Sequence, residues 1–196
     1  MAVGNYWAAD TGEPKRSYRW LLSMQGVDAW IVKTVKKPGF SISESQHDFL
    51  NFRFFFPGRV TWDDVQLTLV DPVSPDASQS LYNLLMASGY VDPIEIGQNI
   101  ANPMTMSKAN SVAALGDVKI RQIDTDGQSY IEEWQLMNAW IKQVDFGNLD
   151  YSSEDLVNIQ VTLKYDWARL NSEGQSVANK VRATDWSKAR MEDVQG

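Results

Sequence analysis

The sequence has no cysteine and a single histidine among its 196 residues. The lack of cysteine excludes disulfide bonds, zinc–thiolate sites, iron–sulfur clusters and a catalytic thiol. No apolar run approaches the roughly 18 to 20 residues that a helix needs to span a bilayer. The opening stretch, "MAVGNYWAADTGEPKR", has neither a basic start nor an apolar segment behind it. We therefore expect no secretory signal and no membrane segment.

Basic residues are also scarce. Eighteen Lys and Arg stand against 25 Asp and Glu, which gives a formal net charge of −7. Proteins that hold nucleic acid neutralise its phosphates with clusters of Lys and Arg. The acidic balance argues against such binding, but it is compatible with a surface that DNA passes without sticking.

Motifs for catalysis are missing. The sequence has no glycine-rich phosphate loop, no dinucleotide fingerprint, and no Gly-x-Ser-x-Gly turn to accompany His47. Asp63-Asp64 and Glu132-Glu133 are paired carboxylates, but adjacent residues of a strand face opposite sides of a sheet. Neither pair would then share a substrate. We predict that the chain is not an enzyme, that it uses no cofactor, and that His47 lies on the surface.

One stretch, "QIDTDGQSYIEE", has the look of a calcium loop. Placing Gly127 at the sixth position of such a loop makes Asp124, Asp126 and Glu133 ligands. Gln122 would then hold the first position, where Asp is wanted, and the flanks alternate like strands. Asp-Gly between alternating strands is a strong hairpin signal. We therefore expect a hairpin turn and no metal.

What the chain does have is aromatic residues, with eight Trp, seven Tyr and seven Phe. That content suits sheets and interfaces better than helical bundles. The length and the lack of an obvious linker favour one domain over residues 1–196. Within it we expect a polar N-terminal arm at 1–15 and a polar C-terminal extension at 168–196, which forms a short helix or stays mobile.

Alternation of apolar and polar residues predicts a mainly antiparallel β protein. The pattern is clearest over 157–167, where one face should be buried and the other wet. One helix is expected over 77–88, with Asp76 or Ser74 as its N-cap and Gly89 just past its end. Residues 90–116 read as an irregular excursion. Further strands, including a hairpin across the turn at 25–28, are predicted at 18–24, 29–35, 60–71, 118–123 and 128–146. Two of them contain irregularities, at Asp63-Asp64 and at Asn138-Ala139.

The stretch "NFRFFFPGRV", residues 51–60, gathers phenylalanines beside a predicted Pro-Gly turn, after a polar loop at 41–51. Alternation would bury only two of Phe54, Phe55 and Phe56, and Phe and Arg are enriched at protein contacts. A strand buried on both faces is the alternative. We favour a subunit or ring interface made of Phe49, Phe52, Arg53, Phe54, Phe55, Phe56 and Arg59.

Two segments carry a resemblance to a known family. "FFFPGRVTWDDVQLTLVDP" resembles a Pro-Gly-Arg stretch of the tail tube proteins of contractile-tailed bacteriophages. "IRQIDTDGQSYIEEWQLMNAWIKQVDFGNLDYSSEDLVNIQVTLKYDWA" is similar to the C-terminal half of that family. The two segments are residues 54–72 and 120–168. The sequence departs from the family at "SESQHDFLN", at "LVDP" and at Ile141, and residues 90–116 and those after Ala168 have no counterpart.

The resemblance implies a small β-sandwich or barrel with one flanking helix. It implies homo-hexameric rings, whose strands join into one inner barrel, stacked into a tube within a contractile sheath. Implied partners are the sheath, baseplate tube-initiator, tape measure and tail terminator proteins. DNA would pass through transiently, and the protein would assemble in the host cytoplasm and reside in the virion. Lumen-facing acidic candidates are Asp124, Asp126, Glu132 and Glu133.

Other functions remain open. A baseplate tube initiator, or the tube of a bacterial contractile injection or secretion system, would share the fold. A carbohydrate-binding β-sandwich with aromatic platforms belongs to a different class. The helix at 77–88 and the Asp-Gly hairpin argue against it, because a lectin has no need of that order of elements.

Overall fold

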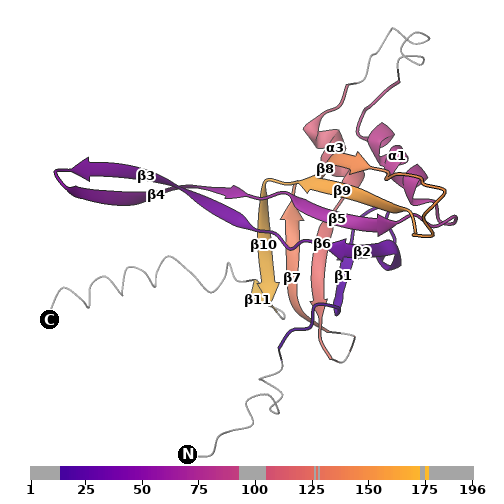
Figure 1. The fold of residues 1–196 in the computed structure, drawn as a ribbon, viewed down its shortest axis with the longest axis horizontal. Coiled ribbons are helices and arrows are strands. Elements are labelled where there is room, and N and C mark those ends of the chain that lie inside the picture. Colours follow the sequence, from indigo (N-terminus) through magenta and orange to yellow (C-terminus); the bar gives the residue numbers. More distant parts are fainter. Residues whose placement is uncertain (1–13, 93–104, 126, 128, 173–174, 177–196) are drawn as a thin grey trace, which may run out of the picture. The chain divides into compact units, whose positions relative to one another are not determined.

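The computed structural model describes residues 14–92, 105–125, 127, 129–172 and 175–176. Within them the chain is mainly antiparallel β, as the sequence predicts, with strands in three sheets (Figure 1). A five-stranded sheet has the order β1 (Trp20–Ser23), β6 (Val118–Ile123), β7 (Tyr130–Met137), β10 (Trp167–Ser172), β11 (Gln175–Ser176). A four-stranded sheet has the order β2 (Val32–Val35), β5 (Val65–Val70), β9 (Asn158–Lys164), β8 (Trp140–Asp145). β3 (Phe40–Phe49) and β4 (Phe52–Trp62) form a separate two-stranded sheet.

The chain divides into two compact units. One contains the described residues of 14–21, 120–133 and 170–176, and the other those of 22–119 and 134–169. The four-stranded sheet, the β3–β4 hairpin and the helices all belong to the second unit. The expectation of a single domain stays a prediction.

The core of the second unit lies on one face of the four-stranded sheet. Leu67 and Leu69 of β5 lie directly opposite Val161 and Ile159 of β9. All four side chains are at most 2% exposed. Leu163 and Tyr165 continue the buried row, so the alternation over 157–165 is confirmed. Trp167 departs from it, because that residue begins β10 and is exposed.

Helix α1 (Ala77–Ala87) is confirmed together with its caps. The Asp76 side chain accepts a hydrogen bond from the Gln79 backbone N–H at 2.8 Å, as an N-cap does. Gly89 follows the helix with a φ of +97°, which favours glycine at this position. Leu81 and Leu84 are buried, whereas Leu85 stays partly exposed.

The expected irregular excursion at 90–116 contains a second helix, α3 (Lys108–Leu115). The Ser107 hydroxyl accepts a hydrogen bond from Asn110 N–H and caps it. The helix escaped prediction because its sequence, "KANSVAAL", is short and only weakly amphipathic. The remainder of the excursion, residues 93–104, lies outside the described residues.

Several strand predictions need correction. The strand expected at 60–71 is interrupted after Trp62, because residues 60–62 end β4 and residues 65–70 form β5 in another sheet. The strand expected at 29–35 begins as a 3-10 helix, η1 (Ala29–Ile31). β1 and β2 belong to different sheets, so the hairpin expected across 18–35 is reduced to one isolated bridge between Met24 and Val27. The expected strand at 128–146 breaks at Asn138, which has a φ of +56°, into β7 and β8 of different sheets. The polar extension after 168 begins with strands β10 and β11, where a helix or a mobile tail was expected.

The hairpin expected around Asp-Gly is confirmed, since β6 and β7 are neighbours in the sheet. Gly127 has a φ of +70°, and its N–H donates to the Asp124 carbonyl. The turn is flanked by strands, as in a hairpin, whereas a helix–loop–helix calcium site would be flanked by helices.

Candidate assembly interface

The β3–β4 hairpin corrects the prediction of a polar loop followed by a Pro-Gly turn. Residues 40–49 are a strand, and the chain reverses at Leu50 and Asn51, where Leu50 has a φ of +53°. Pro57 and Gly58 lie inside β4. In Figure 1 the two strands run out from the four-stranded sheet of the same unit as a twisted ribbon.

A bulge divides this ribbon. Ile42 lies opposite Val60 and Glu44 opposite Pro57, so Gly58 and Arg59 together face Ser43. The Arg59 backbone N–H donates to the Ser43 hydroxyl at 2.8 Å. A Cβ at Gly58 would lie 2.3 Å from that oxygen, which accounts for glycine there. β4 is also an edge strand, and a bulge on an edge strand is where a sheet tolerates proline.

Outside the bulge, the register decides which side chains share a face. Phe49 lies opposite Phe52, while Phe54 and Phe56 lie opposite His47 and Ser45. Directly opposite residues of antiparallel strands project on the same side. We call Phe49, Phe52, Phe54 and Phe56 the phenylalanine face. The reverse side carries Phe55, the Asp48–Arg53 ion pair at 2.9 Å, and Glu44.

None of the seven residues predicted as an interface is buried by its own chain. The phenylalanine face is 50 to 67% exposed, and Phe55 is 57% exposed. Arg53 and Arg59 are exposed as well. The alternative that the phenylalanines fill the core of a doubly buried strand is therefore wrong for this chain. Their role in contacts between subunits remains a prediction.

The root of the hairpin is anchored, in contrast to its far end. Phe40 and Trp62 stack edge to face with 5.4 Å between ring centroids, and Trp62 lies 6.1 Å from Tyr165. Burial, and then the charges of Asp63 and Asp64, raise the pKa of Tyr165 to about 12. The ribbon thus leaves the core from a packed aromatic cluster.

Asp64 reinforces this root. Its carboxylate accepts hydrogen bonds from Lys142 of β8 at 2.6 Å and Lys164 of β9 at 2.7 Å. Those two bonds hold the pKa of Asp64 below its ordinary value of 3.8. Asp64 therefore links β8 and β9 to the junction between β4 and β5 through its two ion pairs.

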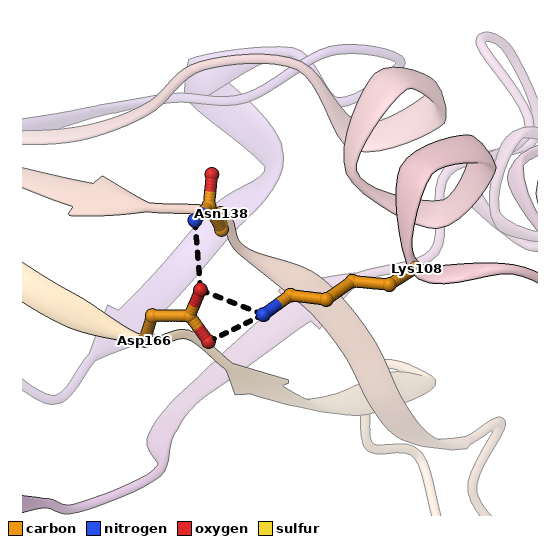
Figure 2. A network of polar contacts seen from close by, with 3 residues as sticks. All are labelled: Lys108, Asn138 and Asp166. Atoms are coloured by element: carbon orange, nitrogen blue, oxygen red, sulfur yellow. Dashed lines mark hydrogen bonds and ion pairs between the residues drawn. The ribbon is translucent and has the colours of Figure 1, made fainter.

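A second polar network ties together three segments of the same unit (Figure 2). Both oxygens of Asp166 accept hydrogen bonds from Lys108 at the start of α3 at 2.7 Å, and one also accepts from Asn138 at 2.7 Å. Lys108, and then Asn138, lower the pKa of Asp166. Asn138 and Asp166 lie where the chain passes between the sheets, so the network fixes both crossings.

The acidic candidates for a lumen fall into two groups. Glu132 and Glu133 are buried, and they form ion pairs with Lys15 and Arg121, the latter at 2.6 Å. Asp124 is half-buried at the β6–β7 turn. Asp126 lies outside the described residues. These ion pairs have no local signature in the sequence, because Lys15 and Glu132 are 117 residues apart and Arg121 and Glu133 are 12 residues apart.

His47 is exposed, as predicted, and faces Phe54 across the ribbon. Among the described residues, no cluster of three or more His, Asp or Glu side chains is arranged to hold a metal ion. A membrane-crossing helix is likewise not found in the described part of the chain.

The β8–β9 loop (residues 146–157) is a second candidate surface, and no prediction from the sequence points to it. Leu149, Tyr151 and Leu156 are large and apolar, yet each is more than two-thirds exposed. The available signal was three large apolar residues set among turn-forming Gly, Asn, Asp and Ser. They follow no period of two or 3.6, so they fit neither a strand nor a helix.

No protein-family profile and no curated protein sequence matches this chain. Its structure does resemble solved ones. A chain of the sheath–tube complex of the extracellular contractile injection system PVC, in the extended state, superposes with a TM-score of 0.58 at 16% identity, over 82% of this chain and 93% of the other.

Two further structures agree with that similarity. A chain of the PVC sheath/tube terminator gives a TM-score of 0.56 at 16% identity, over 81% of this chain and 97% of the other. A chain of the tube-terminating cap of the anti-feeding prophage gives 0.56 at 16% identity, over 88% and 100%. This chain has the fold of those proteins. At such identities the similarity establishes the fold alone.

Proposed function

We propose that this chain is a structural subunit of the tube of a contractile tail. Copies close into hexameric rings, the rings stack into a hollow tube inside a sheath, and genome DNA passes through the lumen of a phage particle. The observation that carries the proposal is the phenylalanine face, which the chain exposes and does not cover. The fold shared with chains of tube-containing particles agrees with it.

The energetics favour an assembling protein over a solitary one. An apolar patch of this kind on a monomer marks an interaction site. Each phenylalanine that becomes fully covered contributes about 1.5 to 3 kcal/mol. Four per contact, repeated around a ring, make a strong association while the isolated chain stays folded on its own four-stranded core.

The sheet edges support ring closure. β2 and β8 are the outer strands of the four-stranded sheet, and unpaired edges are normally protected or paired. A closed cyclic ring pairs each edge with an unlike edge of the neighbouring copy. In this proposal strands of successive subunits continue one another as an inner barrel.

For the lumen, Asp124 and Asp126 are the stronger acidic candidates. Glu132 and Glu133 are neutralised by their ion pairs, so they would add little repulsion toward phosphate even if the lumen reached them. A lumen with excess negative charge lets DNA slide, because it offers no cations to phosphates.

A tube, tube-initiator or terminator protein of a contractile injection particle is the second candidate. The specific observation in its favour is that the structures reported above come from such particles. In either setting the proposed partners are sheath, baseplate tube-initiator, tape measure and terminator proteins, and the role is structural and not catalytic. A phage gene neighbourhood with capsid genes separates the two.

Electron microscopy of the purified chain at rising concentration tests the proposal. We expect rings or tubes from the unmodified chain and none from the double variant Phe54→Ser/Phe56→Ser. Val73→Ser is the control, because Val73 is a fully exposed apolar residue that follows β5 and is not part of the hairpin. A chain that stays monomeric at every concentration contradicts the proposal, and glycan binding by that monomer would favour the carbohydrate-binding alternative.

A further inference from the structure

The β8–β9 loop is held in shape by its own hydrogen bonds. The Asp150 side chain accepts from both the backbone N–H and the hydroxyl of Ser152, at 2.9 and 2.8 Å. The Ser153 hydroxyl lies 3.0 Å from the Asp155 carboxylate and accepts from its backbone N–H. The loop is therefore preorganised, with Leu149, Tyr151 and Leu156 left facing outward.

This loop encloses a surface hollow of about 640 Å³. Leu149, Tyr151, Leu156 and Val157 supply its apolar lining, and Asp150 and Asp155 line it as well. A hollow of this size is in the range that holds bulky organic groups, about 300 to 1,000 Å³. It is thus large enough to receive aromatic side chains.

Charge decides which surface fits it. Residues 145–158 include Asp145, Asp150, Glu154 and Asp155 but no Lys or Arg. The phenylalanine face bears no carboxylate, and Arg59 lies at the bulge that ends it. The reverse side of the ribbon carries Glu44 and the Asp48–Arg53 ion pair, so two carboxylates and one guanidinium leave it with a net negative charge that the loop would repel.

The hairpin also has the reach for an external contact. Ten residues of extended β3 span about 33 Å. Within the described part of the chain, both the far end of the hairpin and the β8–β9 loop are exposed.

We propose that the phenylalanine face of one copy docks on the β8–β9 loop of a second copy, with Arg59 toward the acidic rim of the loop. The inference rests on the proposed function and names the surface that covers the hairpin. The contact joins unlike patches, so each copy offers one of each and the contact repeats from copy to copy.

The absence of cysteine makes cross-linking a clean test. We would combine Ser45→Cys, on the phenylalanine face, with Ser153→Cys in the loop, and treat the assembled full-length chain with a short flexible bismaleimide. The matched control replaces Ser45→Cys by Gln46→Cys, one residue along β3 and on the reverse side. Each single variant, treated alone, reports cross-links between like positions.

We expect a ladder of covalent oligomers from the Ser45/Ser153 pair and at least tenfold less product from the Gln46/Ser153 pair. An equimolar mixture of the two single variants should stop at dimers, which shows that the link joins different copies. Equal products from both pairs, or none from either in assemblies that form normally, overturn the docking inference alone. An unmodified chain that never assembles removes both the inference and the proposed function.

A second readout does not depend on cross-linking geometry. Leu149→Ser/Tyr151→Ser should raise the concentration required for assembly by about tenfold or more, because it removes apolar area from the contact. Val73→Ser should leave that concentration unchanged. Assembly of the loop variant at the unmodified concentration would contradict the docking inference.

Discussion

The four-stranded sheet and the β3–β4 hairpin are built from similar residues but reach opposite outcomes. Both place large apolar side chains on one face of antiparallel strands. In β5 and β9 those side chains are at most 2% exposed, whereas on the hairpin they are at least half exposed. The difference lies in coverage: the apolar face of β5 and β9 is buried within its own unit, whereas no other described segment of the chain buries the phenylalanine face.

This contrast teaches that alternation of apolar and polar residues identifies the apolar face of a strand, but does not tell which surface covers that face. A face covered by its own chain contributes to folding, and a face left open contributes to association. The same substitution should therefore change two different measurements, depending on the region in which it is made.

The largest expected effect is on folding. Leu163→Ala in β9 should lower the free energy of unfolding by about 2 to 5 kcal/mol, because Leu163 is fully buried and the change leaves a cavity. Phe54→Ala on the hairpin should change it by only about 0.5 kcal/mol. Urea denaturation of both variants, below the concentration for assembly, measures this. Similar losses would show that the hairpin is part of the folded core.

The next effect is on association, and it sharpens the distinction between the two sides of the ribbon. Phe54→Ser should weaken assembly by about 1.5 to 3 kcal/mol per contact, or roughly tenfold to a hundredfold in concentration. Phe55→Ser, on the reverse side, should weaken it less. Sedimentation over a concentration series compares the two. A stronger effect of Phe55→Ser would mean that the contact uses the reverse side of the ribbon, and it would contradict the assignment to the phenylalanine face.

A smaller effect is expected at the root that joins the two regions. Asp64→Asn should cost about 1 kcal/mol, because the two lysine partners of Asp64 are partly exposed and such ion pairs are individually weak. Since folding lowers the pKa of Asp64, its contribution is present above pH 3.8 and is lost as the pH falls through the folded pKa. Denaturation at pH 7 and pH 3 should therefore show that the difference in free energy of unfolding between wild type and variant is smaller at pH 3.

The smallest effect, with an unusual sign, is expected at Tyr165. Its hydroxyl is buried, and it has no hydrogen-bond partner within the described part of the chain. Tyr165→Phe should thus be neutral or stabilising by up to about 1 kcal/mol.

The pH dependence of Tyr165 follows from its raised pKa. The contribution of the protonated Tyr165 to the free energy of unfolding is fully present below about pH 10 and is lost as the pH rises toward 12. The Phe variant should not show this decrease. Thermal unfolding of both proteins at pH 8 and pH 11 tests this. An equal loss in both would show that another group is responsible.

The elements that could be predicted from the sequence are those with a local signal. β9 alternates because one face is buried, and α1 has a capping Asp76 and a terminating Gly89. The strand at 40–49 could not be predicted, because neither side of the ribbon is buried and "FSISESQHDF" has no reason to alternate. Pro57-Gly58 predicts a turn from the sequence alone, although a bulge accepts both residues.

For the candidate site, the phenylalanine run stood out in the sequence because such residues rarely gather beside loops without a partner. The phenylalanines that share a face could be identified only from the pairing register of β3 and β4, and the bulge at Gly58 shifts that register. The ion pairs of Glu132 and Glu133 join distant or opposite positions and have no local signature. The β8–β9 loop was missed for the same reason as the ribbon, since an external surface imposes no period on the sequence.

Hydrogen–deuterium exchange of the hairpin at low and high protein concentration tests the central claim most directly. The account predicts that peptides covering residues 44–57 exchange rapidly in the dilute chain and become protected at high concentration, while β5 and β9 remain equally protected throughout. Rings or tubes in which residues 44–57 exchange as fast as in the dilute chain would contradict it.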